Sequence, residues 1–289
     1  MNSLQVIEGE THHVFLPQDL IRFSLPYRST RTTEWIRTNG NEEYAITAGR
    51  IRDAKTGKMK SLIPSGKVAR QILLWACTRA KVTKKKTITV PSSLKVFVQD
   101  LGLPWSQSTG QEVVNQLQAL INCTLQITTT TEVDGERKIE YRRMLIAQDA
   151  TLWFVDGDMS NRHRSQITLS DELYRQMKTA VPIDKGIYDD LQRGTKSPLV
   201  LDVYLWLCLR LYGRSKPSRV TWKQLHEQFG SQADLKRFKI TFREALAKAK
   251  EVYPQARILE YNAETRGGFH GFQIFPSPDP RGRLTIIQG

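Results

Sequence analysis

The pattern Leu-Trp-x-Cys-x-Arg occurs twice in the chain, each time inside a long apolar stretch. The first copy runs from Leu74 to Arg79 and the second from Leu205 to Arg210. Because the chain holds only six Trp and three Cys, the same order arising twice by chance is improbable, and an internal duplication is favoured. The alternative is a pair of unrelated buried helices.

The segments that follow the two copies correspond as well. Short helices are predicted at 93–102 and 221–230, and aligning Gly102 with Gly230 places Lys95 on Lys223. Each copy continues into a third predicted helix and a strand pair, which is the element order of a winged helix. We therefore expect an α+β fold with two tandem winged-helix domains related by internal duplication, preceded by a short β-containing N-terminal segment.

Turn signals and shifts in composition divide the chain into five segments. We expect an N-terminal segment with short strands at 1–63, the first winged-helix domain at 64–155, a linker with bridging elements at 156–196, the second winged-helix domain at 197–276, and a C-terminal tail at 277–289.

Capping residues predict where the helices begin. Ser65 is a plausible N-cap for the first long helix, and Ser197 followed by Pro198 starts the second. Thr109 with Glu112 and Thr221 with Gln224 have the spacing of capping boxes. The third helix of the second unit is predicted from about 233 to 253, before Pro254.

The charge of the chain favours a polyanionic partner. Forty-three Lys and Arg against 29 Asp and Glu give a formal net charge of +14, which promotes fast, salt-dependent association with nucleic acid and, second, with anionic membranes. No apolar run approaches the roughly 20 residues that span a bilayer, and residues 1–10 lack the pattern of a secretory signal. We expect a cytoplasmic protein without a membrane partner.

Cysteine and histidine are not placed for metal binding or disulfides. Cys77, Cys123 and Cys208 are odd in number, widely spaced and set among apolar neighbours, which is typical of reduced packing residues. No Cys or His cluster has the spacing of zinc ligands. We expect neither a metal nor a cofactor.

The third helix of the second unit is the predicted DNA-reading element. Lys236, Arg237, Lys239 and Arg243 lie toward its N-terminal half, which is the part that enters the groove in recognition helices. Arg243 is the candidate for a base contact, since Arg can bond guanine through two hydrogen bonds, and the lysines are candidates for phosphates. The alternative is that these cations only solubilise the helix.

Three further sets of residues are candidate DNA contacts. Arg266 lies at the tip of the predicted wing of the second unit, with His270 beside it; the alternative is that Gly267 and Gly268 simply form a tight hairpin. In the first unit, uncharged amides occupy one side of the third helix and cations occupy the hairpin; the amides could pair with adenine or merely be solvated. These first-unit residues are Gln111, Asn115, Gln118, Arg137, Lys138, Arg142 and Arg143.

Signatures of catalysis are weak. Asp156 and Asp158 follow a hydrophobic strand, as do the metal-binding carboxylates of primases, but a strand ending in Asp-Gly-Asp is usually a turn. There is no Gly-x-x-x-x-Gly-Lys loop for nucleotide phosphates and no histidine pair flanking one hydrophobic residue. We expect a protein that acts by binding and is not an enzyme.

Several segments, taken in order, resemble those of the plasmid-encoded RepA replication initiators. The resemblance covers most of residues 20–275 and rests on Ser24 to Arg28, Leu62 to Gly66, Gln71 to Trp75, Ser93 to Phe97, Leu101 to Leu103, Ser197 to Tyr204, Thr221 to Leu225, Gln228 to Gly230 and Val252 to Arg257. One departure is residues 105–109, Trp-Ser-Gln-Ser-Thr, where the family tends to be rich in Thr and Gly; it bears on the contacts of the first domain.

The resemblance implies a function. Family members bind repeated sites in double-stranded DNA at a plasmid origin, help to open the duplex, and bring in the host replication initiator and replicative helicase. A homodimer is a further expectation. The alternatives are a winged-helix transcriptional regulator or repressor that uses the same surfaces and, third, a primase-like enzyme using Asp156 and Asp158.

Overall fold

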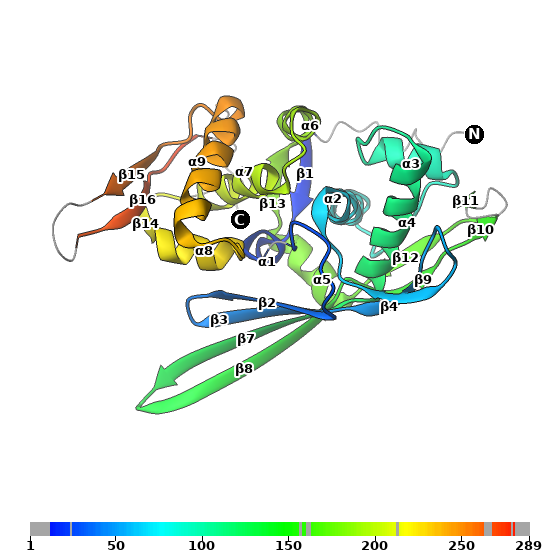
Figure 1. Cartoon of the computed structure of the whole chain (residues 1–289), viewed down its shortest axis with the longest axis horizontal. Helices are drawn as coiled ribbons and strands as arrows, with labels where there is room; N and C mark the ends of the chain where they lie inside the picture. The colour runs from blue at the N-terminus through cyan, green and yellow to red at the C-terminus, as the bar shows by residue number, and fades with distance from the viewer. Residues whose placement is uncertain are drawn as a thin grey trace.

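The computed structural model describes residues 12–23, 25–155, 158–159, 163–211, 214–262, 268–278 and 280. Figure 1 shows its helices and strands. The helices are α1 (Gln18–Arg22), α2 (Gly66–Thr83), α3 (Leu94–Asp100), α4 (Gln107–Asn122), α5 (Asp171–Gln176), the 3-10 turn η2 (Met177–Thr179), α6 (Lys185–Gly194), α7 (Pro198–Leu211), α8 (Trp222–Phe229) and α9 (Leu235–Val252). The strands of the N-terminal half are β1 (His13–Leu16), β2 (Glu34–Asn39), β3 (Glu42–Thr47), β4 (Gly49–Arg52), β5 (Met59–Leu62), β6 (Thr87–Thr89), β7 (Thr124–Val133) and β8 (Glu136–Leu145). Those that follow are β9 (Ala147–Thr151), β10 (Phe154–Val155), β11 (Asp158–Met159), β12 (Gln166–Leu169), β13 (Val181–Asp184), β14 (Ser218–Thr221), β15 (Ile258–Asn262) and β16 (His270–Ile274).

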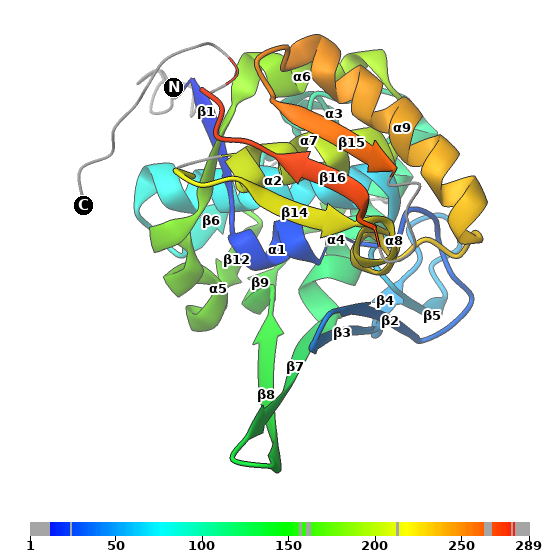
Figure 2. The ribbon, with the colours of Figure 1, turned by 90° about the vertical axis from the view of Figure 1, so that its left-hand side faces the viewer.

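A four-stranded antiparallel sheet in the order β2-β3-β7-β8 supports the N-terminal half. Its strands β7 and β8 form a long hairpin that projects away from the helices (Figures 1 and 2). The hairpin closes with two residues, Asp134 and Gly135, which both have positive φ. That turn matches the right-handed twist of the flanking strands, so the Asp-Gly pair fixes the register of the whole projection.

The C-terminal unit has the predicted sequence of elements. Helices α7, α8 and α9 are followed by β15 and β16, and β14 completes a three-stranded sheet in the order β14-β16-β15. Aromatic rings hold this unit together, because Trp222 packs edge to face against Phe238, Phe242 and Phe272. The first three-helix set, α2, α3 and α4, is also followed by a hairpin, β7–β8. The fold is therefore mixed α and β, with several small sheets.

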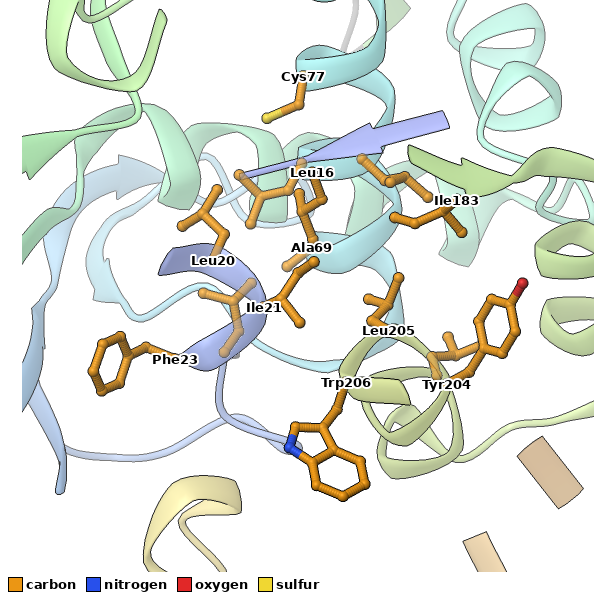
Figure 3. Packing of buried hydrophobic residues seen from close by; sticks show 14 of the residues in the cluster. Leu16, Leu20, Ile21, Phe23, Ala69, Cys77, Ile183, Tyr204, Leu205 and Trp206 are labelled. Carbon is orange, nitrogen blue, oxygen red and sulfur yellow. The ribbon is translucent and has the colours of Figure 1, made fainter. Parts of the chain in front are cut away.

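One hydrophobic cluster runs through both halves of the molecule. It includes side chains from β1, α1, α2, β13 and α7, among them Leu16, Ile21, Ala69, Ile183 and Leu205 (Figure 3). The two helices that carry the repeated pattern, α2 and α7, both contribute to it. The halves are thus packed on one another rather than merely linked.

The segment expected to be a linker is built into this core. Strand β13 pairs with β1, and β12 lies between β6 and β9. Leu169, Leu173, Ile183 and Tyr188 are all buried. Residues 163–196 therefore form packed structure that connects the two halves, because their alternating and helical apolar positions find partners on β1 and α2. The division of the chain into five segments stays a prediction.

The capping predictions fared unevenly. The capping box of Thr221 and Gln224 is present, and Gly230 ends α8 in the left-handed conformation. In the first unit α4 begins earlier than predicted, because the Ser106 hydroxyl accepts the Thr109 amide at 3.0 Å and takes the N-cap position from Thr109. Ser65 precedes α2, although its side chain makes no capping hydrogen bond.

Candidate nucleic-acid interface

Helix α9 presents one buried and one exposed side. Phe238, Phe242 and Ala249 are buried against the rest of the unit. Asp234 caps the helix, since its carboxylate accepts the Arg237 amide at 2.8 Å. On the outside Lys236 and Arg237 are exposed, and neither has an ion-pair partner in the part of the chain that the structure describes. They give the first turn of α9 two free positive charges.

Further along α9 the predicted base-reading arginine is already engaged. Arg243 makes two hydrogen bonds to the Glu260 carboxylate of β15, at 2.9 and 2.7 Å. The Trp222 indole N–H donates to the same carboxylate at 3.2 Å, and the Arg243 guanidinium lies 5.0 Å from the Trp222 ring centroid. The ion pair lowers the pKa of Glu260 and raises that of Arg243. Arg243 therefore joins α9 to the β15–β16 hairpin, with its Nε and Nη2 atoms engaged by Glu260.

Lys239 belongs to the same cluster. Its ammonium lies 5.6 Å from the Trp222 ring centroid, and its side chain is half-buried. A cation over an aromatic face is held by the ring quadrupole while its outer side stays open to solvent. Sequence reasoning missed both Trp222 and Glu260 as parts of this surface, because nothing in their local sequence links them to α9.

One face of the β15–β16 hairpin is exposed, opposite the face on which Glu260 meets α9. Leu259 and Tyr261 are exposed by 53% and 42%. His270 is exposed at the start of β16, opposite Asn262. Arg266, predicted for the tip, lies outside the described residues. His270 therefore lies on the hairpin that packs beside α9 in the C-terminal unit.

The expected exposed amide face of α4 is covered. Asn115 is buried, and its carbonyl accepts the Ala54 amide at 2.9 Å. Gln118 makes two hydrogen bonds to the backbone of Arg52, at 3.0 and 2.9 Å. The prediction of an open polar surface was wrong here, because β4 and the turn after it lie over this side of α4. Gln111 is half-buried at the start of the helix.

Glycine makes that covering possible. At Gly49, the first residue of β4, a Cβ atom would lie 2.0 Å from the carbonyl oxygen of Asn122 at the end of α4. Such a contact is sterically forbidden, so only glycine allows β4 to approach the helix this closely. The approach leaves the amides of α4 with backbone partners in place of water.

The cations of the β7–β8 hairpin differ in their surroundings. Arg142 forms an ion pair with Asp19 of α1 at 2.6 Å, and Arg143 donates to Gln126 at 3.3 Å. Lys138 pairs with Glu140 at 3.1 Å. Arg137, next to the turn, is exposed and has no ion-pair partner among the described residues. Arg137 lies opposite Glu132 in the strand register, and Asp134 and Glu136 lie in and beside the turn, so the cations near the tip are accompanied by acidic residues.

Within the described residues no group of three or more His, Cys, Asp and Glu is arranged to hold a metal ion. Asp156 lies outside the described residues, and so does the side chain of Asp158. Over the same described residues no helix has the length and apolarity to cross a membrane.

The fold is similar to that of two solved structures of RctB. Crystal structures of domains 2 and 3 of RctB resemble the chain: the selenomethionine form has a TM-score of 0.53 and 10% identity, covering 86% of this chain and 93% of that one. A second structure of the same domains has a TM-score of 0.50 and 10% identity, covering 90% and 97%. At this identity the likeness concerns the fold. No curated protein matches the chain at a significant level of sequence similarity.

The family follows from the sequence itself. Residues 63–224 match the family described as plasmid-encoded RepA protein. The match covers more than half of the chain and spans α2 to the start of α8. The chain therefore belongs to the plasmid-encoded RepA family, which confirms the resemblance predicted from its motifs.

Proposed function

We propose that this protein is a plasmid replication initiator that binds repeated origin sites in double-stranded DNA and acts without catalysis. Membership of the RepA family supports the initiator role, and the net charge of +14 suits a polyanionic partner. The observation that carries the DNA-binding part is the pair of free cations, Lys236 and Arg237, at the exposed first turn of α9.

The proposal treats α7, α8, α9 and the β15–β16 hairpin as a winged helix. In that arrangement α9 enters the major groove by its N-terminal end and the hairpin follows the backbone beside it. Lys236, Arg237 and Lys239 would contact phosphates or bases, and Arg266 and His270 would accompany them from the hairpin. Arg243 would mainly hold the two elements in register through Glu260.

A second contact is proposed for the β7–β8 hairpin. The hairpin projects from the body of the molecule, which supports a contact with DNA outside the stretch that α9 would bind (Figure 2). Arg137 near the tip would engage phosphate, joined by Lys138 once it leaves Glu140, whereas Arg142 and Arg143 are held by Asp19 and Gln126. The proposal includes a second winged helix in the N-terminal half, related to the first by duplication. Its helix α4 would support the structure and would not read bases.

Protein partners complete the proposal. Strand β8 forms an edge of its sheet, and Ile139 and Tyr141 on it are exposed by 45% and 68%. An open edge strand with apolar side chains supports pairing with another protein. A second copy of the chain, the host replication initiator and the replicative helicase are the proposed partners.

The first test is the affinity for repeat-containing DNA beside the protein's own gene against a scrambled duplex at physiological salt. We expect a preference of about 10³ or more, as for site-specific binders. Changing Lys236 and Arg237 together to Ala should weaken binding strongly. The matched control changes Lys248 and Lys250 together to Ala. This also removes two positive charges from α9, but in its C-terminal half. Equal affinity for both duplexes, or equal loss in both variants, would overturn the proposal.

A further inference from the structure

A pocket of about 390 Å³ lies between the N-terminal segment and the C-terminal unit. Four arginines line it: Arg22 of α1, Arg210 of α7, Arg214 just after α7, and Arg219 of β14. The other lining side chains among the described residues are uncharged and include no Asp or Glu. Four arginine residues lining one small pocket are an unusual concentration of like charge.

Among the residues that the structure describes, only one of these arginines has a carboxylate partner. Arg22 pairs with Glu42 and lies 3.8 Å from Asp19. Arg210, Arg214 and Arg219 have no ion-pair partner in the described ranges, and Arg219 instead lies 5.3 Å from the Phe269 ring centroid. The pocket therefore keeps about three uncompensated positive charges.

Arg210 is the most constrained of the set. Its Nε atom is buried and has no hydrogen-bond partner among the described residues. Burial, followed by the charges of Arg214 and Arg22, lowers the pKa of its guanidinium. An unsatisfied buried donor on a cation costs free energy, which an anion in the pocket would offset.

The repeated Leu-Trp-x-Cys-x-Arg pattern provides an internal comparison. Arg79 ends the first copy, lies 5.2 Å from the Trp75 ring centroid, and is neutralised by Asp100 at 3.0 Å. Arg210 ends the second copy and lies 5.9 Å from the Trp206 ring centroid. The alignment of Gly102 with Gly230 places Gln228 at the position of Asp100.

Gln228 lines the pocket together with Arg210. The carboxylate that neutralises the arginine in the first copy is thus replaced by a neutral amide in the second. This exchange leaves Arg210 available to an external anion and adds hydrogen-bonding groups in place of a competing negative charge.

We propose that this arginine pocket binds a phosphate-bearing ligand of the size of a diphosphate or triphosphate group. Arg210, Arg214 and Arg219 would bind its oxygens, and Gln228 would donate from its amide. Guanidinium groups suit phosphate because each can donate two parallel hydrogen bonds. Since these side chains come from α7, its following loop and β14, and Arg22 comes from α1, a bound phosphate would tie the C-terminal unit to the N-terminal segment. The inference is independent of the proposed DNA contacts of α9.

The test is calorimetric titration of the full chain with inorganic pyrophosphate and, separately, ATP. We expect saturable binding at one site, weakened about ten-fold or more by Arg210→Gln and by Gln228→Asp. The first change removes a charge-assisted contact, and the second supplies a carboxylate that competes with the ligand for Arg210. The matched control is Arg79→Gln, which removes the corresponding charge outside the pocket and should leave binding unchanged.

Stability measurements separate loss of the site from loss of the fold. Gln228→Asp should keep or raise the Tm of the ligand-free protein, because it places a carboxylate beside Arg210, while it reduces the rise in Tm caused by pyrophosphate. No saturable binding by the unchanged chain, or equal loss in the Arg79→Gln control, would overturn the proposal.

Competition with duplex DNA identifies the source of the phosphate. If pyrophosphate and DNA bind together, the pocket takes a free phosphate compound. If DNA displaces pyrophosphate, and Gln228→Asp weakens both ligands, the pocket holds a phosphate of the DNA backbone. Both results keep the phosphate site.

Discussion

Arg70 on α2 and Asp202 on α7 form a buried two-point ion pair, in which Nε to Oδ1 and Nη2 to Oδ2 both measure 2.8 Å. The two side chains are exposed by only 5% and 3%. Arg70 also donates to the backbone carbonyls of Pro26 and Gly66 at 3.1 and 2.8 Å, and to that of Leu25. The pair therefore joins the two helices that carry the repeated pattern and the segment before β2.

Removing either partner should destabilise the whole molecule. Asp202→Ala leaves a buried guanidinium without its counter-charge, and we expect a loss of about 3 to 5 kcal/mol in the free energy of unfolding. Denaturant titration measures this loss. The control is Arg193→Ala, which breaks an exposed pair with Asp190 and should cost less than about 1 kcal/mol. Equal effects of the two changes would show that the buried pair contributes little.

The turn between β4 and β5 should respond to acid through Asp53. Its carboxylate accepts the Thr56 amide at 2.8 Å and pairs with Lys60. Lys60 is the main cause that holds the pKa of Asp53 well below its usual range, and the Thr56 hydrogen bonds add to it. The folded-state pKa is depressed, so the stabilisation is complete above the ordinary pKa of about 3.9 and is lost as pH falls through the folded-state value.

NMR titration of the Asp53 carboxyl carbon checks this expectation. In the unchanged protein the midpoint should lie below the ordinary range, and Lys60→Met should move it up toward that range. A midpoint that Lys60→Met leaves in place would contradict the assigned cause. The amide exchange of Thr56 should quicken as Asp53 is protonated.

The three cysteines should be inert toward thiol reagents in the folded protein. Cys77, Cys123 and Cys208 are free and buried, and burial raises the pKa of each thiol to about 12. The thiolate is the reactive form, so a colorimetric disulfide reagent at pH 8 should label none of them until denaturant is added. Rapid labelling of the native chain would show that one of these thiols is accessible.

A substitution at Asn115 tests whether this side chain supports the fold or reads DNA bases. Because its side chain accepts the Ala54 amide at 2.9 Å and is buried, Asn115→Ala should cost about 1 to 3 kcal/mol of stability. The ratio of affinities for repeat and scrambled DNA should stay unchanged. A change in that ratio without a change in stability would restore the base-reading role that the amide pattern predicted.

Local signals predicted several elements, and contacts between distant segments limited the prediction of the site. The apolar stripe of α9, the capping box at Thr221 and the Asp134-Gly135 turn are each encoded within a few residues. The covering of Asn115 by the β4–β5 turn and the pairing of Arg243 with Glu260 depend on how segments meet in space. An exposed helix face can be predicted from periodicity only when nothing else packs on it.

Glu260 is expected to limit the strength of DNA binding through its pair with Arg243. Glu260→Gln removes one negative charge beside α9 and frees the Arg243 guanidinium, while a Gln carbonyl can still accept the Trp222 N–H. We expect tighter binding to unrelated duplex DNA and a salt dependence steeper by about one counterion, as one further cation becomes available to phosphate. Fluorescence anisotropy at several salt concentrations measures both quantities.

The control for this prediction is Glu251→Gln, which makes the same change of charge near the C-terminal end of α9, where the side chain is exposed. If both variants tighten binding equally, the gain comes from net charge alone and the release of Arg243 is irrelevant. If only Glu260→Gln steepens the salt dependence, the Arg243 guanidinium released from Glu260 binds DNA. A simultaneous gain in preference for repeat DNA would then identify Arg243 as a base contact, because phosphate contacts strengthen binding to all sequences alike.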